Sequence, residues 1–173
     1  MFEDEFGLSF SEPVGCTWAP RGQPPCLKRV GKYRRELSSL AGLTITGRVF
    51  KKHFKGSIDS EKVIEGLEHL GRHIRRSFIL IWDHSRTHQS RRVQQYLARH
   101  PEIQVEFLPT YAPELNPEEF CHGNVKRRLT NAIFLSTTEI RKDLDRGFAR
   151  LRRRPDLLIA CFHHAGLSLN QLW

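Results

Sequence analysis

A short apolar segment that ends in an aspartate constrains the fold of this 173-residue chain more than any other feature. Residues 77–82 read Ser-Phe-Ile-Leu-Ile-Trp, a run that is too short for a helix and rich in β-branched and aromatic residues. Such a run predicts a strand that is covered on both faces. Asp83 follows at its carboxyl end, where open α/β sheets place ligand-binding groups. The segment therefore predicts an α/β fold with a functional acid at one edge of the sheet.

A second candidate acid lies at a predicted helix start. Residues 116–119 read Asn-Pro-Glu-Glu, with the asparagine typical of an N-cap, the proline of the first helical position and the acids of the first turn. A helix N-terminus favours the ionised carboxylate, which is the form that a hard cation such as Mg²⁺ binds. Taken singly, Asp83 also fits a turn residue, and a glutamate at the third helical position also fits a capping box.

The first ten residues predict a strand that carries a third acid on an apolar face. With a period of two, Asp4 lies between Phe2 and Phe6, while Glu3 and Glu5 point to the opposite face. An acid on an apolar face needs a partner, because an unpaired buried charge is costly. A metal ion shared with the other two acids would supply that partner.

Together these segments resemble the catalytic domain of the IS630 and Tc1/mariner group of DDE transposases, over nearly the whole chain. The most specific match is residues 108–119, Leu-Pro-Thr-Tyr-Ala-Pro-Glu-Leu-Asn-Pro-Glu-Glu. Further matches are residues 2–7, residues 17–23 (Thr-Trp-Ala-Pro-Arg-Gly-Gln), and residues 81–84 (Ile-Trp-Asp-His) with His88. The resemblance implies a ribonuclease-H-like fold, an α/β structure with a mixed sheet flanked by helices, and here with extra C-terminal helices.

The resemblance also assigns the site. It implies that Asp4, Asp83 and Glu119 are catalytic and bind Mg²⁺, with Mn²⁺ as a substitute. The last acid of Asn-Pro-x-Glu is the metal ligand in this family, which selects Glu119 over Glu118. Residues 84–118 separate the second and third acids, a spacing close to the usual one in the family. The implied function is DNA strand cleavage and strand transfer as the catalytic part of an insertion-sequence transposase. Element ends and target DNA are the implied partners, and a homodimer is implied because transposition brings two ends together.

The chain departs from the family pattern after two of the acids and at its front. His84 follows Asp83 where many relatives have asparagine, and Cys-His-Gly at residues 121–123 follows Glu119, whereas relatives carry a tryptophan shortly after this acid. We expect residues 1–173 to form a single catalytic domain without the helix-turn-helix region that precedes it in relatives. Two alternatives remain open: a catalytically silent DNA-binding remnant of a transposase, and a domain that works with a separately encoded N-terminal DNA-binding part.

The net charge of +9 is concentrated in two segments that bracket an acidic centre. Residues 21–55 hold ten Lys or Arg against one acid, and residues 120–173 hold ten against four, whereas residues 56–119 hold eight against ten. Basic segments around a metal-dependent site are expected to grip a polyanion, and the alternative is a solvated basic face. The candidate DNA-binding residues are Arg21, Lys28, Arg29, Lys32, Arg34, Arg35, Lys126, Arg127 and Arg128.

The remaining segments predict alternating strands and helices. Residues 43–50 predict a strand with a turn or bulge at Gly47 that forms an antiparallel edge. Helices are predicted after Asp59 and Ser60, over 89–100 and from the capping box Ser-Thr-Thr-Glu at 136–139, with a last short helix over 156–165. Residues 103–108 predict a strand parallel to the one that ends at Asp83.

His88, five residues after Asp83, could contact a phosphate or orient the site, but a surface helix cap is the commoner position for such a histidine and is expected here. The four cysteines lack the paired spacing of a zinc ribbon, so reduced thiols are expected. No apolar run approaches the length of a membrane span and no signal peptide is evident. We therefore expect no membrane partner and a prokaryotic cytoplasmic protein that resides with the chromosome.

Overall fold

The first strand, β1 (Phe2–Leu8), lies at the centre of a five-stranded sheet in the computed structural model, which describes residues 1–10, 14–26 and 36–169. β1 pairs antiparallel with β2 (Leu37–Leu43) on one side and parallel with β4 (Phe78–Trp82) on the other. The sheet is completed by β3 (Val49–Lys55) beside β2 and β5 (Ile103–Phe107) beside β4, in the order β3-β2-β1-β4-β5. The predicted mixed sheet is confirmed.

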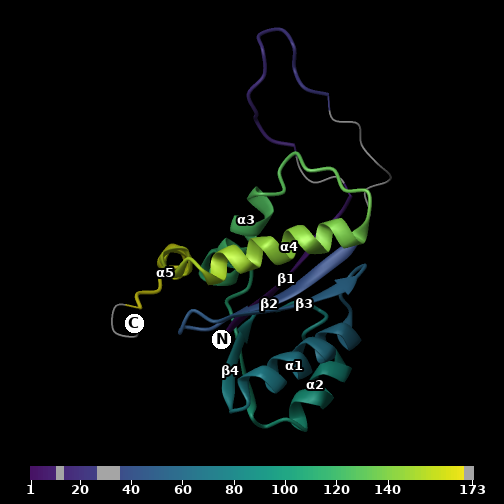
Figure 1. Cartoon of the computed structure of the whole chain (residues 1–173). Coiled ribbons are helices and arrows are strands. Elements are labelled where there is room, and N and C mark those ends of the chain that lie inside the picture. Colours follow the sequence, from purple (N-terminus) through teal and green to yellow (C-terminus); the bar gives the residue numbers. More distant parts are fainter. Residues whose placement is uncertain (11–13, 27–35, 170–173) are drawn as a thin grey trace.

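Helices cover both faces of this sheet (Figure 1). One face carries α1 (Ser60–Ile74) and α2 (Arg91–Ala98), and the other carries α3 (Pro117–Arg127), α4 (Thr137–Arg152) and α5 (Pro155–His164). A short 3₁₀ turn, η1 (Pro113–Leu115), precedes α3. Each layer has its own hydrophobic core, because alternate side chains of a strand point to opposite faces. None of the helices in the described part of the chain is long and apolar enough to cross a membrane.

The helices begin where the capping signals in the sequence place them. Asp59 caps α1 and accepts a hydrogen bond from the backbone N–H of Lys62 at 3.0 Å. Ser136 caps α4 by accepting from the N–H of Glu139 at 3.2 Å, and the Glu139 carboxylate accepts from the N–H of Leu135 at 2.8 Å. Each bond satisfies a backbone donor that the helix leaves unpaired, so the predicted helix starts are confirmed.

Two expectations about the strands are wrong in part. The predicted turn at Gly47 is confirmed, with a φ of 71°, but residues 43–50 are not one strand, because residues 44–48 form the whole turn between β2 and β3. The antiparallel edge itself is confirmed. The second error concerns β4, which is not covered on both faces along its whole length. Leu80 and Trp82 are fully buried, but Ile79 is 49% exposed.

Candidate metal centre

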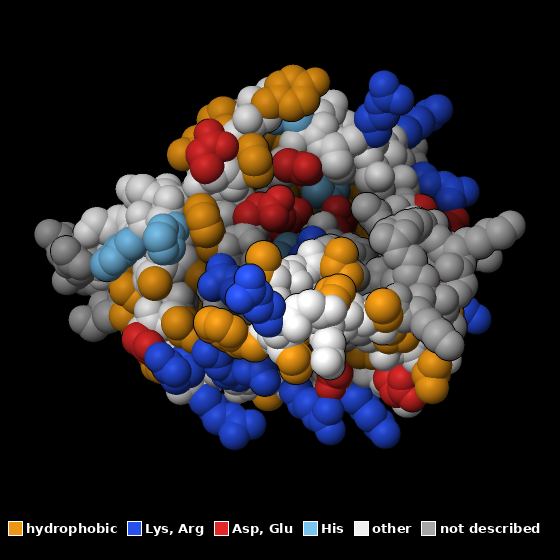
Figure 2. Space-filling model, turned by 90° about the horizontal axis from the view of Figure 1, so that it is seen from above, with side chains coloured by type: hydrophobic (Ala, Val, Ile, Leu, Met, Phe, Trp, Pro, Cys, Tyr) orange, Lys and Arg blue, Asp and Glu red, His pale blue; other side chains and the backbone are white. Residues whose placement is uncertain are grey.

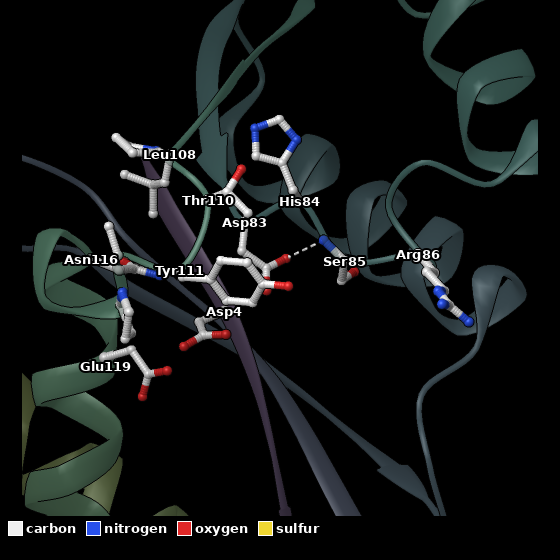
Figure 3. A pocket seen from close by; sticks show the side chains of 13 residues that line it. Asp4, Asp83, His84, Ser85, Arg86, Leu108, Thr110, Tyr111, Asn116 and Glu119 are labelled. Atoms are coloured by element: carbon white, nitrogen blue, oxygen red, sulfur yellow. Dashed lines mark hydrogen bonds between the residues drawn. The ribbon is translucent and has the colours of Figure 1, made fainter.

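The parallel pairing of β1 with β4 sets two of the predicted acids side by side. Phe2 pairs with Ile81, so Asp4 and Asp83, each two residues further along, lie level with one another. Because side chains alternate along a strand, both carboxylates fall on the face that Phe2 and Ile81 occupy. Both acids line one pocket of about 380 Å³ at this end of the sheet (Figure 3).

Asn116 brings the third acid to the same pocket. Its side-chain oxygen accepts a hydrogen bond from the N–H of Glu118 at 3.1 Å and caps α3, while its side-chain amide donates to the carbonyl of Glu3 at 3.2 Å. The cap is thus tied directly to β1. Glu119, in the first turn of α3, consequently lines the pocket beside Asp4 (Figure 3). The structure therefore brings Asp4, Asp83 and Glu119 together from three distant segments.

The donor set of this pocket fits a divalent cation. Burial and repulsion from the neighbouring Asp4 carboxylate raise the pKa of Glu119. A hard cation relieves this repulsion and takes carboxylate oxygens as ligands. Figure 2 shows acidic side chains gathered around a hollow on this face, with Lys and Arg side chains on either side of it.

The buried side chain of His88 contacts the carboxylate of Asp83 and fixes its position. The Nδ1 of His88 lies 2.8 Å from the Oδ1 of Asp83, and the same carboxylate accepts a hydrogen bond from the N–H of Ser85 at 2.9 Å. The hydrogen bond from His88 is the main reason why the pKa of Asp83 is lowered. The expectation that His88 is a surface helix cap is wrong, because its side chain is 1% exposed and stacks on Trp82 with ring centroids 4.0 Å apart.

The other nitrogen of His88 faces acids that the sequence placed on the opposite side of β1. Its Nε2 lies 3.2 Å from the Oε1 of Glu5 and 3.9 Å from the Oε2 of the buried Glu3. Burial alone would lower the pKa of His88, but the carboxylates of Asp83, Glu5 and Glu3 outweigh it and raise this pKa to about 11. Sequence reasoning missed this cluster, although two acids on one face of a central strand were a signal that a cation lies opposite them.

Glu118 and Glu119 point in different directions, as expected for successive helical residues. Glu119 lines the pocket, whereas the side chain of Glu118 is fully buried, with its Oε1 3.2 Å from the Nε2 of His122. The Nδ1 of His122 lies 3.5 Å from the Oδ2 of Asp4. Burial alone would lower the pKa of His122, but Asp4 and Glu118 raise it to about 9. Neither Glu118 nor His122 was a predicted site residue.

A comparison with protein families identifies the family of this chain. The model of the DDE superfamily endonucleases matches residues 1–141, more than half of the chain. The chain belongs to this family. No curated protein matches it significantly.

Solved structures of Mos1 mariner transposase share the fold of this DDE endonuclease domain. The Mos1 strand transfer complex superimposes with a TM-score of 0.67 and 20% identity, over 95% of this chain and 54% of that one. The Mos1 paired-end complex with Mn superimposes with a TM-score of 0.66 and 19% identity, over 95% of this chain and 55% of that one. The Mos1 catalytic domain alone superimposes with a TM-score of 0.62 and 17% identity, over 96% of this chain and 82% of that one. The ribonuclease-H-like fold is thus confirmed. The chain spans about half the length of the complexed Mos1 chains.

Part of the predicted DNA-contacting surface of the DDE domain can be located. Lys126 lies two turns beyond Glu119 on α3, with its Nζ 5.1 Å from the centre of the Phe6 ring. Arg127 and Arg128 follow it and are exposed, as is Arg21. The remaining candidates lie outside the described residues: Lys28, Arg29, Lys32, Arg34 and Arg35.

Proposed function

We propose that this chain catalyses metal-dependent DNA strand cleavage and strand transfer as the catalytic part of an insertion-sequence transposase of the IS630 and Tc1/mariner group. The observation that carries the proposal is the convergence of Asp4, Asp83 and Glu119 on one pocket of a DDE superfamily endonuclease. The similar Mos1 structures include a strand transfer complex and a paired-end complex with Mn, which supports DNA and a divalent metal as partners here.

Asp4, Asp83 and Glu119 would hold the metal, Mg²⁺ or Mn²⁺. When bound, such an ion supplies an activated hydroxyl for attack on the phosphodiester and stabilises the charge on the leaving oxygen. The protein's contribution is to keep the acids in place. His88 and Ser85 fix the carboxylate of Asp83, and Asn116 fixes the helix start that carries Glu119.

Exposed groups around the pocket suit a nucleic acid. Tyr111 lines the pocket and its side chain is 98% exposed, on a backbone with a φ of 58°, which few residues other than glycine adopt. Exposed aromatic rings at nucleic-acid sites stack on unpaired bases. Arg86 also lines the pocket, and Arg21, Lys126, Arg127 and Arg128 would contact phosphates, which position DNA without reading its sequence.

A nicking assay on duplex DNA with Mg²⁺ or Mn²⁺ tests the proposal. Glu119→Gln removes a charged pocket acid and should reduce cleavage by about a hundredfold or more, since even outer-shell changes at metal sites cost roughly 10–100-fold. Glu114→Gln is the matched control, because Glu114 is an exposed acid in η1 that does not line the pocket. Equal activity of the two variants would contradict the proposed site.

The same assay separates the alternatives. An intact fold that binds DNA but shows no cleavage with either metal would select the catalytically silent remnant. Cleavage that appears only after a separate DNA-binding protein is added would select a domain that works with a separately encoded recognition part.

We propose that the chain resides in the compartment that holds its DNA and that it acts as a homodimer. Sedimentation with and without DNA ends would check the oligomeric state.

A further inference from the structure

We propose that His122 is a nitrogen ligand of the ion held by Asp4 and Glu119, and that this position therefore selects Mn²⁺ or another first-row transition-metal ion over Mg²⁺. This assignment rests on the proposed metal-dependent function and deepens it by naming an additional ligand and the class of cation.

The first support is the geometry of the three side chains. One ligand atom from each of Asp4, Glu119 and His122 lies within 4.8 Å of the other two. The Nδ1 of His122 is 3.5 Å from the Oδ2 of Asp4. Two donors bound to one ion at about 2.1 Å lie roughly 3 to 4 Å apart, so this pair already has the spacing of ligands. Glu119 is exposed in the first turn of α3 and can turn its carboxylate to complete the set.

The second support is the buried position of the imidazole, whose contacts with the neighbouring carboxylates have poor hydrogen-bond geometry. The His122 side chain is 1% exposed, and neither of its ring nitrogens has a hydrogen bond of acceptable geometry. Both nitrogens nevertheless face carboxylates, Nδ1 at 3.5 Å from Asp4 and Nε2 at 3.2 Å from Glu118, and these acids favour the protonated ring. A bound ion would displace the Nδ1 proton, because metals bind neutral imidazole, and would replace the long contact with Asp4 by two ligand bonds. The Nδ1 is directed at Asp4, on the side of the pocket where the acids converge.

The third support is the carboxylate behind the ring. Glu118 is fully buried, with its Oε1 3.2 Å from the Nε2 of His122. A histidine that binds a metal almost always directs its second nitrogen to a carboxylate, carbonyl or water, which fixes the ring and increases its basicity. Glu118 and His122, on adjacent turns of α3, and Asp4 on β1 thus form a series of carboxylate, imidazole and pocket acid.

The nitrogen donor decides the class of ion. Mg²⁺ prefers oxygen ligands and water, whereas imidazole suits first-row transition metals, whose affinities rise from Mn²⁺ through Co²⁺ to Ni²⁺. A site that adds one imidazole to its carboxylates should therefore bind Mn²⁺ and Co²⁺ more tightly than a site with carboxylates alone, while its affinity for Mg²⁺ changes little.

Pulsed electron paramagnetic resonance of the wild-type chain loaded with Mn²⁺ tests the ligand directly. Coupling of the Mn²⁺ electron spin to a ¹⁴N nucleus of a histidine is the expected result. The coupling should be lost in His122→Leu combined with Glu118→Gln, a double variant that avoids leaving a buried carboxylate without a partner. It should persist in His84→Ala, the matched control, because His84 lines the same pocket but stacks on Phe107.

Calorimetric titrations with MnCl₂ and MgCl₂ give the second readout. The double variant should lose about 10–100-fold in Mn²⁺ affinity, the range for changes around metal sites, while its Mg²⁺ affinity stays within about threefold. Coupling that persists in the double variant, or equal losses for both ions, would overturn the assignment.

The two proposals fail in different ways. If the wild-type chain binds Mn²⁺ and cleaves DNA without ¹⁴N coupling, His122 is a buried partner of Glu118 and Asp4, and only this assignment falls. If neither ion binds and no cleavage occurs in a folded chain, the proposed metal-dependent function falls with it.

Discussion

The side chain of His88 contacts the pocket acid Asp83 with one ring nitrogen and acids on the opposite face of β1 with the other. The Nδ1 of His88 lies 2.8 Å from the Oδ1 of Asp83, and its Nε2 lies 3.2 Å from Glu5. Carboxylates only accept hydrogen bonds, so both ring nitrogens donate and the imidazole is cationic. One buried cation therefore orients a pocket acid and neutralises acids on the other side of β1.

Removing that cation should destabilise the fold. His88→Gln leaves the buried Glu3 and the partly buried Glu5 without a counter-ion, and breaking a buried pair in this way costs about 3–5 kcal/mol. Urea unfolding near neutral pH measures the loss. In the double variant Glu3→Gln/His88→Gln much of the loss should be recovered, and a single variant as stable as the wild type would contradict the role given to His88.

Two glycines of α1 should respond to alanine in opposite directions. A Cβ at Gly66 would collide with the Cδ1 of Leu40 on β2, and it would lie 3.3 Å from the Cγ of the same side chain. Gly66→Ala should therefore destabilise the chain by about 1–3 kcal/mol. A Cβ at Gly71 meets nothing within 4 Å, so Gly71→Ala should stabilise it by up to about 1 kcal/mol through helix propensity. Thermal unfolding of the two variants measures both, and shifts of the same sign would contradict the packing described.

Stability should depend on pH through His53. Burial and the nearby Lys51 and Arg141 lower the pKa of His53 from 6.5 to about 4. The neutral ring accepts from the hydroxyl of Ser39 at 2.7 Å and donates to Asp145 at 3.3 Å. The unfolded histidine gains its proton near pH 6.5, whereas the folded one stays neutral down to about pH 4. The contribution of the neutral His53 ring to the free energy of unfolding is therefore fully present above pH 6.5 and is lost as the pH falls towards 4.

The comparison with His53→Gln isolates this contribution. The difference in unfolding free energy between the wild type and the variant should shrink by on the order of 2 kcal/mol between neutral pH and about pH 4. It should stay constant from neutral pH to about pH 8.5, above the unfolded pKa. A difference that does not change with pH would mean that His53 titrates normally in the folded chain.

DNA binding should weaken steeply with salt and discriminate little between sequences. Phosphate contacts release counter-ions, so each lost contact lowers the slope of log K against log salt by about 1. Arg127→Ala and Arg128→Ala should each reduce the slope by about this amount. Arg72→Ala and Arg76→Ala are the controls, since both residues are exposed at the end of α1, on the opposite face of the sheet.

The preference for one DNA sequence is measured in the same experiment. Binding to an element end and to a random duplex is expected to differ by less than about a hundredfold, or roughly 2.7 kcal/mol. A larger preference would show that residues of this domain read base edges.

Features that depend on neighbouring residues were predictable from the sequence. The caps of α1, α3 and α4 and the strand that ends at Asp83 follow from local conformational preferences and side-chain periodicity, which act over a few residues. The position of Asp4 on the apolar face of β1 followed from the same alternation. β2 was largely missed because its Ser, Ala and Gly residues carry little strand signal, although all seven of its residues are buried in the centre of the sheet.

The site needed contacts between distant segments. The pairing of Phe2 with Ile81 sets Asp4 level with Asp83, and the bond from Asn116 to the carbonyl of Glu3 delivers Glu119 to the same place. Local patterns named Asp4, Asp83 and the two acids at 118 and 119, and the family resemblance selected Glu119 over Glu118. The burial of His88 beneath Asp83, and of His122 between Glu118 and Asp4, was decided only by the packing of helices on the sheet. A histidine has no periodicity of its own, so its partners are set by which carboxylates the tertiary fold brings within reach.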